Sequence, residues 1–386
     1  MNKVRHPKAL TFREPTQDAN LIVHGQGVVV FMPTADQATL TFGQIQVQFT
    51  AIAITGLQLP DLPLLDPKNT RGLTQNVQHW VSLDAQNRRL LGGYGEARQE
   101  NVLYSYSFTA KAPLESLTTV HLEGCRPLRL LRDPITRTVP LIIRPTDTLT
   151  MDDVAGGKVV AKSHLAPVAH KLFDCVSGAN FVLDGPDFPD FSRAIAKSIA
   201  DINGWCYKRL LEKSSEFGKS NPNETYLRIT IGENSGESPG IPYVMEIWPS
   251  QHYSPVHNHG SANAIIRVLS GTINVSLFPH LGSGVQPCAI ADFVKDDITW
   301  LSPTLNQVHQ LKNNDVEPCI TIQCYLYDEK DRDHYDYFDY LDSEGRVQQY
   351  EPDSDMDFVA FKAQMRQEWS GARPKSTGFR RLLCRG

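Results

Sequence analysis

The sequence predicts a mainly β protein made of two β-rich units with a helical stretch between them. Residues 20 to 150 hold short apolar runs of strand length, separated by glycine and proline. From residue 186 to 218 apolar residues recur at the spacing of one helical face. Residues 272 to 277 alternate strictly between polar and apolar side chains, which is the pattern of a half-buried strand.

The composition is that of a globular protein without a strong charge bias. Of 386 residues, 41% are apolar and 21% charged, and 38 basic against 43 acidic residues give a net charge of −5. This balance argues against a nucleic-acid binder, which usually has a basic surplus. The sequence contains no apolar run of about 18 residues, so we expect no spanning helix and no membrane partner.

The first residues and the cysteines predict a cytoplasmic protein. Lys3, Arg5 and Lys8 are followed by a polar stretch, Thr11–Asn20, where a secretory signal would have an apolar one. The 7 cysteines are scattered, odd in number and form no Cys-x-x-Cys pair. This pattern is typical of reduced thiols rather than of disulfides or a zinc ribbon.

Residues 1–150 are predicted to form a β-sandwich or barrel-like domain of unknown role. Their strand-like runs are rich in Val, Ile, Phe and Thr, the residues that favour strands. The pair His79-Trp80 has two interpretations, a carbohydrate or partner site and a buried core pair, of which we favour the second. The predicted strands lie within residues 21–24, 28–31, 39–42, 44–55, 120–122 and 141–144.

The chain then changes from strand-like to helical patterning. Residues 151–165 read as a linker because they combine Asp152-Asp153 with Gly156-Gly157. Asp190 and Ser192 are candidate N-caps for the helical stretch that follows. Its apolar face is expected to consist of Phe191, Ile195, Ile199, Ile202, Trp205 and Leu210.

Residues 166–350 are predicted to form the second unit, a small antiparallel barrel or jelly roll preceded by helices. Short strands between residues 224 and 328 are separated by turns such as Ser270-Gly271 and Ser302-Pro303. The aromatic residues 335–340 then indicate either a pocket lid or an ordinary edge strand. Residues 351–386 are predicted to hold a C-terminal helix near 358–369 and a basic tail, 373–385.

Three histidines form the candidate metal site. His257 and His259 are two residues apart, so on a strand both imidazoles would lie on the same face. His309 follows after a second turn-rich segment. Histidines on neighbouring strands of a barrel can bind one metal ion through three nitrogens and leave its opposite face open. An isolated His-x-His pair also occurs by chance on surface strands, so the prediction depends on all three.

These segments resemble the two motifs of the cupin superfamily. The first motif is matched by His257-x-His259 and Gly271, and the second by Pro303, His309 and Asn313. A cupin usually has a glutamate four or five residues after the second histidine, where this chain has Asn263 and Ala264. Within the superfamily, a three-histidine site without the glutamate resembles the thiol dioxygenases, and cysteine dioxygenase above all.

Further residues extend the resemblance to cysteine dioxygenases over about residues 200–345. Tyr226-Leu-Arg228 is similar to the Tyr-x-Arg of that family, whose arginine binds the substrate carboxylate. Trp248 matches a family tryptophan, and Tyr325 falls where the family has its active-site tyrosine. The resemblance implies substrate-binding roles for Arg228, Tyr226 and Trp248. The first 150 residues lie outside it.

Three features depart from the family pattern: a missing cysteine found in animal members, a changed relay, and the additional 150-residue domain and long C-terminal tail. Ala264 stands where those proteins have a cysteine that is cross-linked to the tyrosine, so no thioether can form here. The family relay Ser-x-His-x-Tyr is replaced by Thr321-x-Gln323-x-Tyr325. Gln323 can orient the tyrosine hydroxyl by a hydrogen bond, but unlike histidine it does not titrate near neutral pH.

The resemblance implies a non-haem Fe²⁺ enzyme that oxidises L-cysteine with O₂ to cysteine sulfinate, an activity of cysteine catabolism. Its partners would be a small thiol and O₂, and Tyr325 and Gln323 would be its catalytic residues. Two alternatives stay open: a dioxygenase for another thiol, such as 3-mercaptopropionate, and a non-catalytic metal-binding cupin that acts as a sensor or binding module. Three imidazoles also suit Zn²⁺, Ni²⁺ and Cu²⁺.

Overall fold

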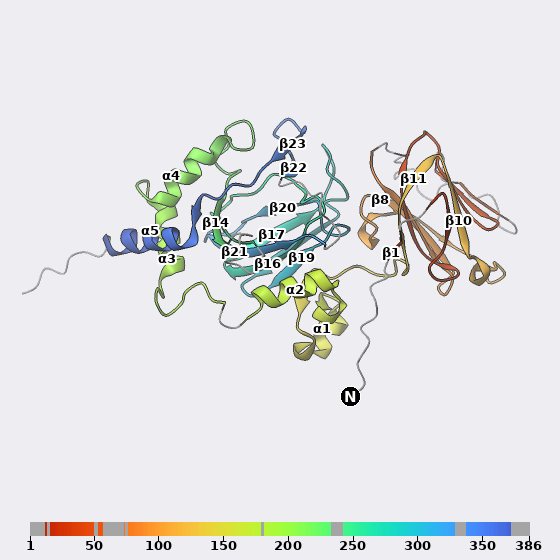
Figure 1. The fold of residues 1–386 in the computed structure, drawn as a ribbon, viewed down its shortest axis with the longest axis horizontal. Coiled ribbons are helices and arrows are strands. Elements are labelled where there is room, and N and C mark those ends of the chain that lie inside the picture. The colour runs from red at the N-terminus through yellow and green to blue at the C-terminus, as the bar shows by residue number, and fades with distance from the viewer. Residues whose placement is uncertain are drawn as a thin grey trace, which may run out of the picture.

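The computed structural model describes residues 12–13, 16–49, 53–56, 73, 76–178, 181–232, 242–328 and 337–371. Two β units lie beside each other, with the helices around the second unit (Figure 1). This architecture confirms the predicted mainly β fold class. None of the helices in these residues combines the length and the apolar character needed to cross a membrane. The basic tail predicted at 373–385 lies outside the described residues.

The N-terminal unit is a sandwich of two antiparallel sheets. Side chains from both sheets, among them Phe31, Leu40, Val81 and Leu122, form one buried core. His79 and Trp80 are both buried, so the pair packs inside this domain, as the second interpretation expects. One sheet has the order β1 (Phe12–Arg13), β11 (Cys125–Leu131), β3 (Gln26–Pro33), β7 (His79–Asp84), β8 (Arg89–Tyr94) and β9 (Val102–Ser107). The other has the order β2 (Asp18–Asn20), β10 (Thr119–Glu123), β4 (Thr39–Phe42), β5 (Ile45–Gln48) and β6 (Ala53–Gly56).

The C-terminal unit is a jelly-roll barrel, a double-stranded β-helix built from two main sheets. The larger sheet has the order β19 (Ile298–Leu301), β16 (Asn263–Ser270), β21 (Cys319–Leu326), β15 (Tyr243–Trp248), β14 (Leu227–Gly232) and β24 (Met356–Asp357). The smaller sheet has the order β18 (Ala289–Val294), β17 (Thr272–Leu277) and β20 (His309–Lys312). In β17 the apolar residues Ile273, Val275 and Leu277 are buried, as their alternation predicts. A hairpin of β22 (Phe338–Leu341) and β23 (Val347–Tyr350) adds a separate ribbon.

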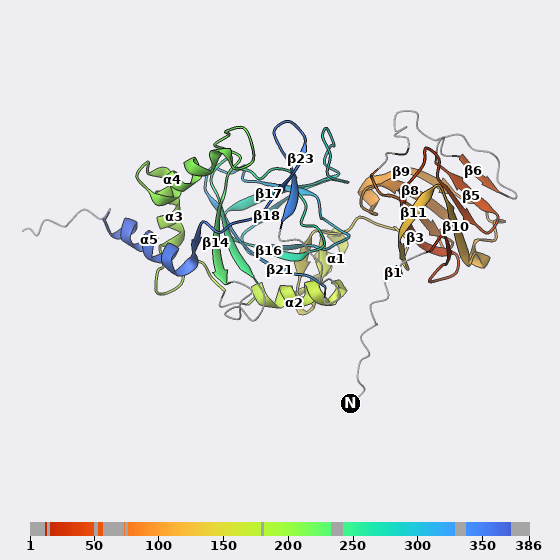
Figure 2. The same ribbon diagram turned by 45° about the horizontal axis from the view of Figure 1, so that its top comes forward.

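Helices and short strands connect and cover the barrel (Figure 2). Residues 151–165, which the sequence predicts to be a linker, hold α1 (Met151–Gly156), β13 (Val159–Ala161) and a 3-10 turn, Lys162–His164. Strand β13 pairs in parallel with β12 (Ile142–Arg144), and α2 (Pro167–Val176) packs on β16 and β21. The remaining helices are α3 (Phe191–Ala200), α4 (Trp205–Glu212) and α5 (Phe358–Gly371), and the other 3-10 turns are η2 (Gln99–Asn101), η3 (Leu114–Ser116), η4 (Thr146–Thr148) and η6 (Lys213–Ser215).

The predicted helical stretch forms two helices, α3 and α4, and its apolar residues do not all lie on one buried face. Ile202 lies in the turn between α3 and α4 and is 66% exposed, so its assignment to the buried face is wrong. Asp190 is the N-cap residue of α3, as predicted, but its side chain makes no capping hydrogen bond, and Ser192 lies inside the first turn. Asp184 instead accepts the hydrogen bond of the Ser192 N–H at 2.7 Å. The carboxylate therefore comes from the preceding loop, a position that the helix N-cap pattern does not include.

Candidate metal centre

The three predicted histidines come together at one end of the barrel. His309 is the first residue of β20, while His257 and His259 lie on an extended segment outside the named strands. This segment is fixed against β20 because the N–H groups of His257 and His309 each donate to the carbonyl of the other residue, at 3.0 and 2.9 Å. The backbone pairing thus brings residues that are far apart in sequence into one cluster.

The cluster has the dimensions of a single metal site. The ring centroids are 4.9 Å apart for His257 and His259, 4.5 Å for His257 and His309, and 5.2 Å for His259 and His309. One nitrogen of each ring lies within 4.8 Å of the others. Among the described residues, no Asp, Glu or Cys belongs to this group. The site is therefore an all-imidazole one, as the replacement of the cupin glutamate predicts.

Backbone carbonyls fix which nitrogen of two of the rings faces the centre. His257 Nδ1 lies 3.0 Å from the carbonyl oxygen of Pro255. His309 Nδ1 lies 3.2 and 3.1 Å from the carbonyl oxygens of Asn306 and Gln307. Since a carbonyl only accepts, Nδ1 carries the proton in both rings and Nε2 keeps its lone pair. The Nε2 atom of His309 is buried and has no hydrogen-bond partner, which fits a metal ligand.

Burial keeps the three imidazoles neutral, the form in which histidine binds metals. Loss of hydration lowers the pKa of His257 to about 3, and the neighbouring His309 adds to this shift. It lowers the pKa of His309 to about 4. The pKa of His259 is lowered well below its usual value by burial and by the two other rings. The donor set therefore needs no deprotonation at neutral pH before it can accept a divalent ion.

A hydrogen-bonded chain of four polar side chains lies next to the histidines. Tyr325 donates its hydroxyl proton to Gln323, and the Gln323 amide donates to a carboxylate oxygen of Glu246. The other oxygen of Glu246 accepts a hydrogen bond from Arg228 Nη1 at 3.0 Å. The Tyr325 ring is 5.4 Å from that of His259 and 5.8 Å from the Arg228 guanidinium. Three of the sequence-predicted residues thus meet beside the metal site.

Glu246 is the member of this chain that the sequence analysis missed. Arg228 on β14 and Glu246 on β15 are directly paired in the sheet register. Burial raises the pKa of Glu246 to about 7, although Arg228 opposes the shift. The available signal was a single carboxylate in the otherwise apolar strand Tyr243–Trp248. When Glu246 is ionised, it cancels much of the Arg228 charge that a substrate carboxylate would meet.

The two other predicted substrate residues lie in the hydrophobic core. The rings of Tyr226 and Trp248 stack at 4.4 Å, and both residues belong to a buried cluster with Phe217 and Val268. Trp248 Nε1 also donates to Thr321 Oγ1 at 3.4 Å. These contacts make the pair a packed wall that supports β14 and β15, and Arg228 is the member of the predicted substrate set that reaches the polar chain.

Phe338 of the hairpin covers one side of the histidines. Its ring centroid is 5.1 Å from those of both His257 and His259. The hairpin is held in place because the Leu341 N–H donates to the Val256 carbonyl at 2.9 Å and the Asn258 N–H to that of Asp339 at 3.0 Å. In the described part of this segment, residues 337–340, the edge-strand interpretation is met by strand β22, and whether it acts as a lid stays a prediction. Residues 335 and 336 lie outside the described residues.

We expect Phe338→Ala to open the site to water and to speed the release of a bound metal ion several-fold. Zinc transfer from the loaded protein to a chromogenic chelator measures this rate. Phe108→Ala is the matched control, because Phe108 is equally buried but lies in the N-terminal sandwich core. Both changes remove a buried ring and lower stability by about 3 kcal/mol or more. Equal release rates in the two variants would show that Phe338 is no shield.

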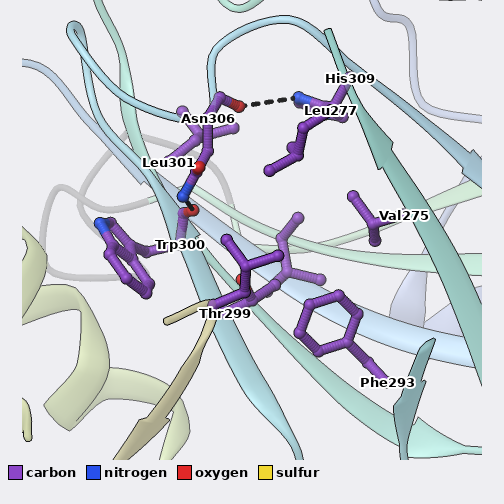
Figure 3. Close-up of a pocket in the computed structure, with 10 residues that line it drawn as sticks. Val275, Leu277, Phe293, Thr299, Trp300, Leu301, Asn306 and His309 are labelled. Carbon is purple, nitrogen blue, oxygen red and sulfur yellow. Dashed lines mark hydrogen bonds between the residues drawn. The ribbon is translucent and has the colours of Figure 1, made fainter. Parts of the chain in front are cut away.

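The other side of His309 faces an apolar cavity (Figure 3). The cavity is small, with a volume of about 20 Å³, and it is partly open to solvent. His309 and Asn306 lie at one end of it, joined by the Nδ1 hydrogen bond. Hydrocarbon therefore shields this face of the ring. The lining residues are Leu141, Ile266, Val275, Leu277, Phe293, Thr299, Trp300, Leu301, Asn306 and His309.

Comparisons with other proteins find similarity in structure alone. No family profile and no curated protein sequence matches the chain. The cupin domain of an XRE-family transcriptional regulator from Enterobacter cloacae is similar over 27% of this chain and 98% of its own, with 12% identity and a TM-score of 0.22. The Schizosaccharomyces pombe Cnp3 cupin domain matches over 27% of this chain and 65% of its own, with 14% identity and a TM-score of 0.22.

An oxalate oxidase in complex with the substrate analogue glycolate matches over 28% of this chain and 53% of its own, with 17% identity and a TM-score of 0.23. This chain thus spans about half the length of that enzyme. The similarities reach no further than a fold. The two main sheets give the C-terminal unit of this chain the double-stranded β-helix architecture, and the histidine cluster is formed by His309 on β20 and the neighbouring segment 257–259.

Proposed function

We propose that the C-terminal cupin domain is a cytoplasmic thiol dioxygenase that uses non-haem Fe²⁺ to convert L-cysteine and O₂ to cysteine sulfinate. The observation that carries the proposal is a buried group of three neutral histidines, without a carboxylate, next to the chain of Tyr325, Gln323, Glu246 and Arg228. The sequence resemblance to cysteine dioxygenases supports the choice of metal and substrate.

The donor set fits the chemistry that thiol oxidation needs. His257, His259 and His309 would hold the ion through neutral nitrogens, so its full positive charge would attract a thiolate and lower the pKa of the thiol. In the overall reaction both atoms of O₂ form bonds to sulfur. The sulfur supplies all the electrons that reduce O₂, and no external reductant is required.

The side chains around the histidines would bind and orient the substrate. Arg228 is the group that can bind a carboxylate through charge-assisted hydrogen bonds, and its place near Tyr325 puts that carboxylate next to the site. The hydrogen bond to Gln323 holds the Tyr325 hydroxyl beside the histidines, and a bound substrate or oxygen would take over its proton when Tyr325 releases Gln323. Phe338 would exclude water from the same space.

A second candidate is a dioxygenase for another thiol, such as 3-mercaptopropionate. One observation favours it: Gln323 replaces the titratable histidine of the family. This replacement changes how a substrate head group is bound, while leaving the thiol chemistry the same. A non-catalytic metal-binding module is the remaining alternative.

We expect O₂ uptake by the iron-loaded protein with L-cysteine, matched by the amount of cysteine sulfinate formed. The measurement is an oxygen electrode trace with product analysis, repeated with 3-mercaptopropionate and cysteamine. His309→Gln, which removes one ligand, is the control for iron bound elsewhere. Higher kcat/KM for 3-mercaptopropionate would select the second candidate. If the protein holds iron but takes up no O₂ with any of the three thiols, both dioxygenase candidates are contradicted and the metal-binding module is favoured.

A further inference from the structure

The N-terminal domain touches the cupin domain next to the metal centre. The contact is made by the loop that follows β8, whose end faces the barrel (Figure 1). Gly95 in this loop has a φ of +68°, and a Cβ at this position would lie 2.2 Å from the Pro279 carbonyl oxygen. The next N–H group, that of Glu96, donates to the same carbonyl at 3.0 Å. Glycine is needed here for both its backbone conformation and this close approach.

The Glu96 side chain holds two backbone amides of the cupin domain. Its Oε2 accepts from the Asn306 N–H at 2.9 Å, and its Oε1 accepts from the Gln307 N–H at 2.7 Å. Arg98, from the same N-terminal loop, donates from Nη1 to the Asn306 side-chain oxygen at 2.9 Å. Two charged residues of the N-terminal domain thus form hydrogen bonds with two consecutive residues of the C-terminal domain.

Those two cupin residues are the ones that orient the metal ligands. The carbonyls of Asn306 and Gln307 accept the Nδ1 proton of His309. The side-chain oxygen of Gln307 accepts from the His259 N–H at 3.0 Å. Gln307 Nε2 in turn donates to the Ala262 carbonyl at 3.0 Å. The loop before His309 therefore fixes one ligand through its carbonyls and a second through a side chain.

The burial of Glu96 and Arg98 distinguishes this contact from ordinary surface pairing. Glu96 is 5% exposed and Arg98 is 1% exposed. Placing charged groups in such a position costs free energy that their mutual attraction only partly offsets. Arg98 pairs more closely with Glu100, at 2.9 Å, than with Glu96, at 3.6 Å, so Arg98 is a loose ion-pair partner for Glu96. The two amide hydrogen bonds are the contacts that the Glu96 carboxylate is best placed to make.

We infer that Glu96 is a positioning residue of the metal centre, through which the N-terminal domain holds His309 and His259 in their ligand geometry. The inference rests on the metal-binding part of the proposed function and is independent of thiol oxidation. It gives residues 1–150 a role: their sandwich carries the loop that completes the site. Asn306 has a φ of +62°, a backbone conformation that non-glycine residues seldom adopt and that the contacts of this loop maintain.

Titration of the full chain with Co²⁺ alone tests this inference. In Glu96→Ala we expect the dissociation constant to rise about 10-fold and the d–d absorption of bound Co²⁺ to change shape, since loss of such supporting contacts weakens metal sites to that degree. Glu96→Gln keeps one acceptor oxygen and should fall between wild type and Glu96→Ala. Asp84→Asn is the matched control, because Asp84 is a buried carboxylate of the same domain whose side chain, within the described ranges, bonds to Asn87 of its own turn.

An unchanged affinity and an unchanged Co²⁺ spectrum in Glu96→Ala would overturn the inference. A merely structural role would lower the melting temperature in the Glu96 and Asp84 variants alike and leave the spectrum of the bound ion as it is in wild type. If wild type itself binds no Co²⁺, or if His309→Gln binds as well as wild type, the proposed metal site fails instead, and the two failures are thereby told apart.

Hydrogen exchange of the metal-free full chain gives a readout that needs no metal. We expect the Asn306 and Gln307 amides to exchange faster in Glu96→Gln than in wild type or Asp84→Asn. Should the Glu96 variants not fold, wild type still decides: Zn²⁺ binding at the histidines should slow exchange at residues 94–101, because coupling between two sites is reciprocal. Exchange at 94–101 that is the same with and without bound Zn²⁺ would contradict the inference.

Discussion

Lowering the pH of the metal-free protein from about 7 to about 5 is expected to reduce its free energy of unfolding by several kcal/mol. The cause is the burial of the metal-site histidines. An unfolded histidine takes up a proton near pH 6.5. In the folded chain, burial lowers the pKa of His257 to about 3 and that of His309 to about 4. At a pH between the folded pKa values and about 6.5, these histidines bind protons in the unfolded state but not in the folded state.

The sign and the range follow from these shifts. Above about pH 6.5 both states are neutral at these residues, and the stability is unaffected. As the pH falls below 6.5, stability is lost progressively, by about 2 kcal/mol for each of His257 and His309 at pH 5. The loss continues until the pH reaches the folded pKa values. His259 acts in the same direction because its pKa is also lowered.

Urea unfolding of chelator-treated protein at a series of pH values measures this effect. In His309→Gln the loss of stability between pH 7 and pH 5 should be smaller by the contribution of His309, about 2 kcal/mol. His121→Gln should keep the loss and make it slightly larger, because His121 is exposed and its pKa is raised by Asp18 and Glu123, so it acts in the opposite direction. A stability that is flat between pH 7 and 5 in wild type would mean that the three imidazoles are not buried together as described.

Glu246→Gln is expected to improve the binding of carboxylated thiols, with KM for L-cysteine falling about 10-fold if the proposed function holds. Glu246 shares Arg228 with any incoming carboxylate. The amide keeps an acceptor for Arg228 and removes the competing charge. Since burial raises the pKa of Glu246 to about 7, the fold already tolerates a neutral group at this position near neutral pH, and we expect the variant to be folded.

The pH dependence provides an internal check on this prediction. In wild type, KM for L-cysteine should fall as the pH is lowered through about 7, because Glu246 becomes protonated and frees Arg228. In Glu246→Gln this dependence should be absent. Arg228→Met should raise KM for L-cysteine in both backgrounds and affect cysteamine, which has no carboxylate, far less. If Arg228→Met has the KM and turnover of wild type for L-cysteine, Arg228 does not bind the substrate.

Several residues of the site can be predicted from short sequence patterns, although they lie far apart along the chain. The two-residue spacing of His257 and His259, together with His309 after a second turn-rich segment, predicts the histidine group, because these patterns depend only on neighbours along the chain. Arg228 and Tyr325 followed from the family resemblance rather than from any periodicity. The alternation in β17 likewise predicted its buried face, since it depends only on neighbours along one strand.

Local sequence patterns do not predict the contacts between segments that are far apart in the chain. Glu96 meets Asn306 across 210 residues, and no pattern within either segment shows that the other exists. Glu246 opposes Arg228 only because of the register between β14 and β15. Phe338 reaches the histidines through the pairing of its hairpin with the Val256–Asn258 segment. These three residues share one feature: each acts through tertiary geometry rather than through a motif.

The most direct test of the central claim is a single turnover of the iron-loaded protein with L-cysteine under isotopically heavy O₂. The proposed function predicts cysteine sulfinate in which both oxygen atoms on sulfur are heavy, and it predicts none from His309→Gln treated in the same way. Cystine or hydrogen peroxide as the only products, or a sulfinate that takes an oxygen from water, would contradict a dioxygenase reaction at the three histidines.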